Sequence, residues 1–207
     1  MKKKHQVFNL IILDESGSMQ RIKNATIDGF NEVVQTIKAV EQKFPEQSHS
    51  ITFISFNSGG IRTLLFNEPA SSIEQIDAKK YQPGQMTPLY DAMGSGISMV
   101  RQETAKCKEF HVLVTILTDG MENASREYTK NQIKELVKEL TEQNWTFTYI
   151  GANHDVETVA LSLSIHNSLH FHANDEDMKK MFRKEGNSRI AYCKKIATKK
   201  DTKKGYF

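Results

Sequence analysis

An apolar run near the start of the sequence ends abruptly in side chains that carry oxygen. In the segment IILDESGSM (11–19), the apolar run stops at the carboxylate of Asp14. Hydroxyls then follow at alternate positions, Ser16 and Ser18. An acid and two hydroxyl side chains directly after a buried strand are unusual in a simple turn. The spacing indicates a loop wrapped around a bound group.

Two further side chains that carry oxygen occur later in the chain. One follows an apolar run, and the other lies just before an expected helix. Asp119 directly follows the apolar run of FHVLVTILTDG (110–120), and Thr87 lies in GQMTPLYDA (84–92), a loop that opens onto an expected helix. Ligands of open α/β sheets bind at the carboxyl ends of the strands, where such loops meet. We therefore expect five oxygen donors to converge: Asp14, Ser16, Ser18, Thr87 and Asp119.

This donor set contains neither nitrogen nor sulfur, which favours a hard divalent cation over zinc. Mg²⁺ or Mn²⁺ fits better than Ca²⁺, because Mg²⁺ readily keeps waters in its shell. If the hydroxyls bind directly and one or both aspartates act through water, one position of the ion stays open. An Asp or Glu from a protein partner would then complete the shell.

The hydrophobic periodicity predicts strands that alternate with helices. The expected strands are 7–14, 50–56, 61–66, 110–118, 145–151 and 168–172, the second and third forming a hairpin with a four-residue loop at 57–60. The expected helices are 25–44, 72–76 (a short turn), 88–103, 129–143, 155–163 and 175–198, the last broken or bent near Gly186. This order is typical of an α/β domain with a mostly parallel sheet and one antiparallel edge strand.

Composition and charge narrow the class of protein further. With 38% hydrophobic and 26% charged residues over 207 positions, the chain has the composition of a single globular domain. We expect a core over about 5–173 and a C-terminal helix with a basic tail over 174–207. A net charge of +3 is too small to indicate a nucleic-acid partner, and the tail lysines are expected to form a solvated helix end or a frayed tail.

The N-terminal segment and the cysteines suggest where the protein works. The basic start and the apolar stretch 7–13 read as a first strand, because Asn9 interrupts the run and Asp14 closes it, unlike a secretion signal. No apolar stretch reaches the roughly 20 residues of a membrane span. Cys107 and Cys193 lack metal or redox spacing. We expect a cytoplasmic, monomeric protein without a membrane partner.

The three oxygen-bearing motifs together resemble the von Willebrand factor A (VWA) family and its metal-ion-dependent adhesion site (MIDAS). The family pattern is D-x-S-x-S, a Thr in a later loop and T-D-G at another strand end, and all positions match here. The resemblance implies a Rossmann-like, three-layer α/β/α fold and metal-assisted protein binding. The chain looks most like intracellular bacterial members that serve chelatase-type machines or tellurite-resistance clusters.

Several residues near these motifs have simpler readings. Asp14 and Ser16 could cap the following helix, and Asp91 is expected to be a first-turn acid rather than a ligand. Glu15 and Glu122 flank the site and are expected to face solvent, where either could tune partner choice.

The segment IGANHDVE (150–157) follows a strand at its carboxyl end. Asn153 and His154 are therefore candidates for a partner-contact rim, whereas Asp155 is expected to cap the next helix. Three more histidines surround a short strand and are expected to be surface residues rather than a second metal site: His166, His170 and His172.

Two other functions use the same residues. A Mg²⁺-dependent phosphohydrolase would polarise a phosphoryl oxygen and activate water, but it lacks a second acid two positions after Asp14, where Ser16 stands. Arg21 and Lys23 are not evidently aimed at the site, and His154 is the one nearby candidate base. A degenerate domain without metal would make Ser16 matter only for stability. We favour a binding module without enzymatic activity.

Overall fold

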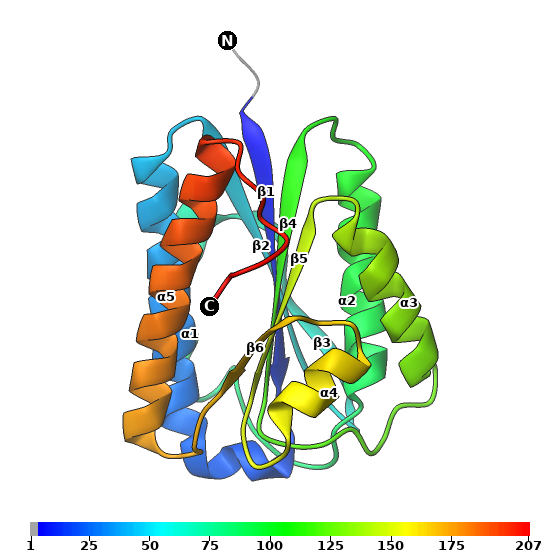
Figure 1. Cartoon of the computed structure of the whole chain (residues 1–207). Coiled ribbons are helices and arrows are strands. Elements are labelled where there is room, and N and C mark those ends of the chain that lie inside the picture. Colours follow the sequence, from blue (N-terminus) through cyan, green and yellow to red (C-terminus); the bar gives the residue numbers. More distant parts are fainter. Residues whose placement is uncertain (1–3) are drawn as a thin grey trace.

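The computed structural model describes residues 4–207, which form one six-stranded sheet with helices on both faces (Figure 1). The strands are β1 (His5–Asp14), β2 (Gln47–Asn57), β3 (Gly60–Pro69), β4 (Phe110–Thr118), β5 (Trp145–Gly151) and β6 (Asn167–His170). The α-helices are α1 (Lys23–Lys43), α2 (Leu89–Thr104), α3 (Lys130–Thr141), α4 (Val156–Ser162) and α5 (Asp175–Ala197), and two 3-10 helices are η1 (Gly17–Ile22) and η2 (Ala70–Ser72).

The strand order β3-β2-β1-β4-β5-β6 places β1 and β4 side by side in the middle of the sheet. Every neighbouring pair is parallel except β2 and β3, which form an antiparallel hairpin at one edge. This confirms the expected α/β sheet with one antiparallel edge strand. The adjacency of β1 and β4 also brings the segments after Asp14 and Thr118 to the same place.

The two faces of the sheet are covered by different helices (Figure 1). Alternate residues of β1 point to opposite faces, so Leu10 joins a core beneath α2, α3 and α4, whereas Ile11 joins a core beneath α1 and α5. A Cβ atom on Gly29 would lie 1.9 Å from the ring of Phe182. Glycine at this position therefore allows α1 and α5 to approach closely.

Four local expectations differ from the structure. The hairpin loop has two residues rather than four, because Asn57 pairs with Gly60. The short helical turn lies at Ala70–Ser72, and residues 73–76 are not helical. Helix α5 continues unbroken through Gly186, since a single glycine inside a packed helix costs only about 1 kcal/mol. Strand β6 ends at His170, two residues earlier than expected.

The C-terminal tail is folded back onto the domain, which corrects the expectation of a solvated helix end or frayed tail (Figure 1). Tyr206 is buried, and its backbone N–H donates to Asn167 Oδ1 over 3.1 Å. The hydroxyl of Thr146 donates to the carbonyl of Thr202, and Lys195 donates to two tail carbonyls. The tail thus covers a part of the sheet that α5 leaves open.

A buried polar network joins α5 and the tail to the sheet. Arg189 donates to Glu185 Oε1 (2.5 Å), to Asn9 Oδ1 (2.7 Å) and to Thr115 Oγ1 (3.0 Å). The Tyr206 hydroxyl donates to the same Glu185 oxygen over 3.0 Å. Both members of the ion pair are almost fully buried, so the network depends on each charge having its partner.

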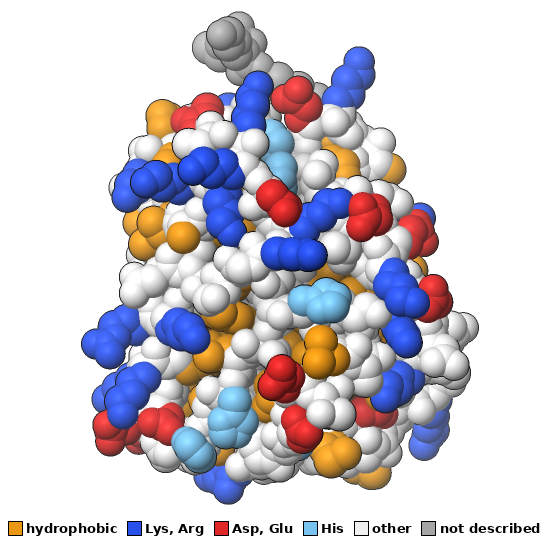
Figure 2. Space-filling model, viewed as in Figure 1, with side chains coloured by type: hydrophobic (Ala, Val, Ile, Leu, Met, Phe, Trp, Pro, Cys, Tyr) orange, Lys and Arg blue, Asp and Glu red, His pale blue; other side chains and the backbone are white. Residues whose placement is uncertain are grey.

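Charge is unevenly distributed along the chain and over the surface. Residues 175–207 contain eleven Lys and Arg but five Asp and Glu, although the whole chain has 28 and 25. The side chains of Lys and Arg gather accordingly over α5 and the tail in Figure 2. The remaining 174 residues carry a small net negative charge.

Candidate metal centre and its surroundings

Asp14 ends β1 as a buried carboxylate that is held on both oxygens. Its Oδ1 accepts from the backbone N–H of Ser16 (2.7 Å), and its Oδ2 accepts from Thr118 Oγ1 (2.6 Å). Ser16 precedes η1, yet its side chain makes no capping hydrogen bond. Its hydroxyl instead lies 3.2 Å from that of Ser18. Helix capping therefore does not account for the Ser16 hydroxyl.

Asp119 lies immediately beyond β4 and is also buried. Ser18 donates its hydroxyl proton to Asp119 Oδ1, which joins the two strand ends directly. The Asn153 amide donates to the carbonyl of Asp119 over 3.2 Å. Arg21 Nη2 lies 3.6 Å from Asp119 Oδ2, which corrects the expectation that Arg21 is not aimed at the site.

Thr87 is brought to the same place by a loop that is tied to the end of β1. The buried Tyr81 hydroxyl donates to the carbonyl of Asp14 (2.6 Å), and Glu15 Oε1 accepts from the N–H of Gln82 (2.5 Å). A further backbone hydrogen bond joins Gly84 to the carbonyl of Glu15. These bonds fix the loop, and Thr87 is buried at its end.

Oxygens from the loop after β1 and from the loop before α2 converge on one point beside Gly120, which follows Asp119. A Cβ atom placed there would lie 3.3 Å from Thr87 Oγ1, 3.6 Å from Ser18 Oγ and 3.8 Å from Asp14 Oδ2. Within residues 4–207, no cluster of three or more His, Cys, Asp and Glu side chains could hold a metal ion. A cation here would therefore depend on two carboxylates and on hydroxyls, a set that fits a hard divalent ion.

The electrostatics of the cluster favour an added positive charge. The pKa of Asp14 is raised to about 6, chiefly by burial and to a smaller extent by the nearby Asp119 carboxylate, whereas hydrogen bonds from Thr118 and Ser16 act in the opposite direction. Two buried carboxylates this close repel each other. A divalent cation between them would offset both the repulsion and the loss of hydration.

Glu15 does not face solvent, contrary to expectation. Its side chain is buried and both of its carboxylate oxygens lie 2.5 Å from Arg62 Nη2, a residue of β3. The carboxylate also accepts from Gln82. Glu15 therefore joins the hairpin, the loop before Thr87 and the end of β1, and its charge is already paired.

Glu122 and Asp91 organise the loop that follows Asp119. Glu122 is half-buried rather than solvent-facing, and it accepts from the backbone N–H groups of Tyr90, Ala124 and Ser125 and from the Ser125 hydroxyl. Asp91, a first-turn acid of α2 as expected, accepts from the N–H groups of residues 126–128 over 2.8–2.9 Å. Both carboxylates shape the segment rather than point into the oxygen cluster.

The rim candidates Asn153 and His154 occupy different environments. Asn153 is exposed, with a left-handed backbone (φ 62°), and its amide contacts Asp119. His154 is half-buried, its Nε2 lies 3.1 Å from the Tyr149 hydroxyl, and burial lowers its pKa. Asp155 caps α4 by accepting from Thr158, as expected.

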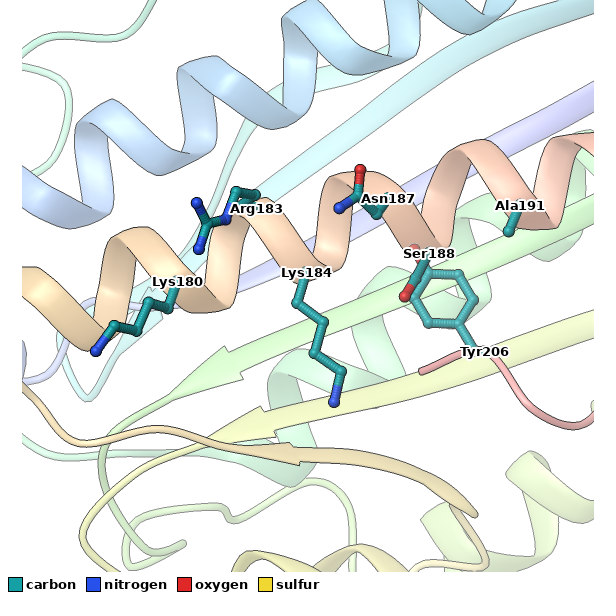
Figure 3. A pocket seen from close by; sticks show the side chains of 7 residues that line it. All are labelled: Lys180, Arg183, Lys184, Asn187, Ser188, Ala191 and Tyr206. Carbon is teal, nitrogen blue, oxygen red and sulfur yellow. The ribbon is translucent and has the colours of Figure 1, made fainter.

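The other polar clusters lie apart from the oxygen donors. The rings of His170 and His172 are 5.1 Å apart, and His172 Nδ1 lies 2.7 Å from Asp177; these histidines and His166 are exposed, as expected of surface residues. A hollow of about 380 Å³ lies between α5 and the tail (Figure 3). Its charged side chains are cations, among them Arg183 and Lys184, so it offers no alternative metal site.

Three residues that support the site were not expected from the sequence. Thr118, the first residue of the T-D-G motif, positions Asp14 rather than merely preceding Asp119. Tyr81 and Arg21 reach the site from positions with no motif of their own. The role of Thr118 could have been predicted, because this residue ends the apolar run of β4. The contacts of Tyr81 and Arg21 depend on loop geometry, which the sequence pattern does not record.

The sheet order and the cluster at the carboxyl ends of β1 and β4 define a Rossmann-like α/β domain. The sequence also matches the family model of the von Willebrand factor type A domain over residues 10–184. The chain belongs to this family, whose domains are generally metal-dependent protein-interaction modules. None of the curated protein sequences compared with the chain matches it.

Solved structures share the fold at low sequence identity. A von Willebrand factor type A protein from Catenulispora acidiphila is 14% identical (TM-score 0.56), covering 87% of this chain and 42% of its own. The pilus adhesin SpaC from Lactobacillus rhamnosus GG is 13% identical (TM-score 0.62), and the match covers 92% of this chain and 30% of SpaC. The manganese-loaded TRAP protein of Plasmodium vivax is 16% identical (TM-score 0.55), and the match covers 86% of this chain and 73% of the TRAP chain. The chain thus spans less than half the length of the first two.

Between residues 4 and 207, no helix has the length and apolar character needed to cross a membrane.

Proposed function

We propose that this domain binds a protein partner through a divalent cation held by Asp14, Ser16, Ser18, Thr87 and Asp119. The observation that carries the proposal is the convergence of the Asp14, Ser18 and Thr87 oxygens beside Gly120, with Asp119 joined to them through Ser18. We propose Mg²⁺ or Mn²⁺ as the ion, since both accept mixed carboxylate, hydroxyl and water shells. An Asp or Glu of the partner would supply the remaining ligand.

The charges of the donors support an acidic partner. Asp14 and Asp119 supply two negative charges, and the three hydroxyl donors are neutral, so the ion retains electrophilic character when the aspartates act through water. A carboxylate is the hard, anionic ligand that such an ion prefers. The flanking acids Glu15 and Glu122 do not compete for the ion, because their oxygens already accept several hydrogen bonds.

Isothermal titration of chelator-treated protein with Mg²⁺ and Mn²⁺ tests the site. We expect one-site binding that is lost in Asp119→Asn, since Asp119 is the acid that bridges to Ser18. Asp28→Asn, which changes an exposed carboxylate of α1, is the matched control. If Asp119→Asn binds both ions as tightly as the wild type, the cluster is not the metal site.

Protein binding is favoured over phosphoester hydrolysis by the surroundings of the cluster. His154, the candidate base, is held by the Tyr149 hydroxyl, and Ser16 occupies the position where a second acid would be needed. Arg21 is a cation of the kind that an enzyme would use, but it is paired with Asp119. Mg²⁺-dependent turnover of a generic phosphate ester, abolished by Asp119→Asn, would reverse this preference.

We further propose a cytoplasmic, monomeric protein of the intracellular bacterial type. The half-buried Cys107 and the buried Cys193 are both free thiols, and unpaired thiols suit a reducing compartment. A secreted, disulfide-linked form isolated from its native cells would contradict the location.

A further inference from the structure

The loops that supply the oxygen cluster also present exposed methionines. Of the described residues, Met86 is 50% exposed and Met121 63% exposed, and these side chains rank among the few large apolar groups on the surface. Met86 directly precedes Thr87, and Met121 directly follows Gly120. Two exposed methionines beside one polar cluster are not explained by packing of the domain itself.

A groove begins at Met86 and runs between the β2–β3 hairpin and the 123–127 segment. Its volume is about 570 Å³, and we call it the methionine groove. Met86 lines this groove, whereas Met121 lies outside it. Its other apolar lining residues are Ile61, Pro88 and Ala124, and its polar and charged ones include Asn57, Ser58, Arg126 and Glu127. The groove adjoins the candidate metal site, because the N–H of Thr87 donates to Asn123 Oδ1 and the N–H of Asn123 donates to the carbonyl of Thr87.

Both walls of the groove are held rigidly. On the hairpin side, Met86 and Ser58 exchange two hydrogen bonds, Met86 N–H to Ser58 Oγ (3.2 Å) and Ser58 N–H to the carbonyl of Met86 (3.0 Å). On the opposite side, the Asp91 and Glu122 carboxylates fix residues 124–128 through backbone hydrogen bonds. A preformed groove loses little conformational entropy when a partner binds.

We infer that the methionine groove binds the residues next to the partner's acidic side chain, and that the partner is an extended segment with an apolar residue close to its Asp or Glu. This inference rests on the proposed function, because the ion would fix the acid and thereby place the following residues over Met86. Methionine is flexible and polarizable, so it can pack against varied apolar side chains. Asn57 and Ser58, which also line the groove, offer polar groups for hydrogen bonds with the peptide backbone.

A displayed library of random linear peptides, selected on the wild-type protein with Mg²⁺ and with EDTA, tests the inference. We expect Mg²⁺-dependent peptides in which Asp or Glu lies within about two residues of an apolar side chain. Met86→Ser should weaken the best synthetic peptide about tenfold, as expected for the loss of one buried methionine contact. Phe66→Ser, which removes an apolar side chain that is 42% exposed on β3, is the matched control and should leave the affinity unchanged.

The possible results separate the inference from the proposed function. Mg²⁺-dependent acidic peptides without an apolar preference, or equal binding by Met86→Ser and the wild type, would overturn the groove and leave the metal-dependent function standing. Selection without Mg²⁺ dependence or acidic residues would overturn the proposed function and this inference with it.

Discussion

Arg21 Nη2 lies 3.6 Å from Asp119 Oδ2, so one of the two acids of the candidate metal centre already has a positively charged side chain beside it. Arg21 belongs to η1, and its side chain is about half exposed, whereas that of Asp119 is fully buried. The pair therefore places a movable positive charge at the edge of the oxygen cluster. An incoming cation and the guanidinium compete for the same carboxylate.

Arg21→Gln is expected to tighten binding of Mg²⁺ about two- to fivefold. The gain is small because the guanidinium is half exposed and lies 3.6 Å from the carboxylate, so the attraction is worth no more than about 1 kcal/mol. The gain should shrink further as salt is raised. Calorimetric titration at low and high ionic strength measures both effects. Weaker metal binding in Arg21→Gln would indicate that Arg21 supports the site instead of competing for it.

Gly120→Ala is expected to lower metal affinity more than tenfold while the protein stays folded. Its new methyl group would lie 3.3 Å from Thr87 Oγ1 and would fill the space on which the donor oxygens converge. Gly84→Ala, in the loop before Thr87, is the matched control, since its Cβ meets nothing within 4 Å. Metal titration and thermal unfolding of both variants separate a blocked site from a damaged fold. Equal affinities in the two variants would place the ion elsewhere.

Arg189→Leu is expected to reduce the free energy of unfolding by about 3–5 kcal/mol, because it leaves the Glu185 carboxylate buried without its cation. Urea denaturation measures the loss. The double change Glu185→Leu with Arg189→Leu should recover part of it, since the unpaired charge is removed as well. A double variant less stable than Arg189→Leu would show that the network stabilises the fold through packing rather than through charge pairing.

His49 is expected to make the domain less stable in mild acid. Burial, assisted by Arg189 and His5, lowers its pKa from 6.5 to about 3. The unfolded chain therefore binds a proton below about pH 6.5 that the folded protein does not, so stability is complete above that pH and falls as the pH is lowered toward 3. At pH 5 the loss from this residue is about 2 kcal/mol.

Urea unfolding of the wild type and His49→Gln across this pH range isolates the contribution of the imidazole. Other groups, among them Asp14 with its raised pKa, affect both proteins alike. The difference in stability between the two should change by about 2 kcal/mol from pH 7 to pH 5. A constant difference would mean that His49 becomes protonated without opening the fold.

The sequence predicted the strands most accurately where they are buried on both faces. The bounds of β4 and β5 agree with expectation, because a continuous apolar run has sharp ends. The structure also brings the five predicted oxygen donors to the same edge of the sheet, and that they hold a cation stays a prediction. The environment of Glu15 was missed because its partner, Arg62, comes from the hairpin, and no local pattern records a contact between residues 47 positions apart.

The folded-back tail has a consequence for how this domain forms during synthesis. Tyr206 reaches the Glu185–Arg189 pair in the core from beyond the end of α5. On a ribosome, β4 and β5 emerge long before residues 198–207, at translation speeds of about 5–20 residues per second. The nascent domain must therefore keep part of this face of the sheet exposed until Thr202 and Tyr206 have left the exit tunnel.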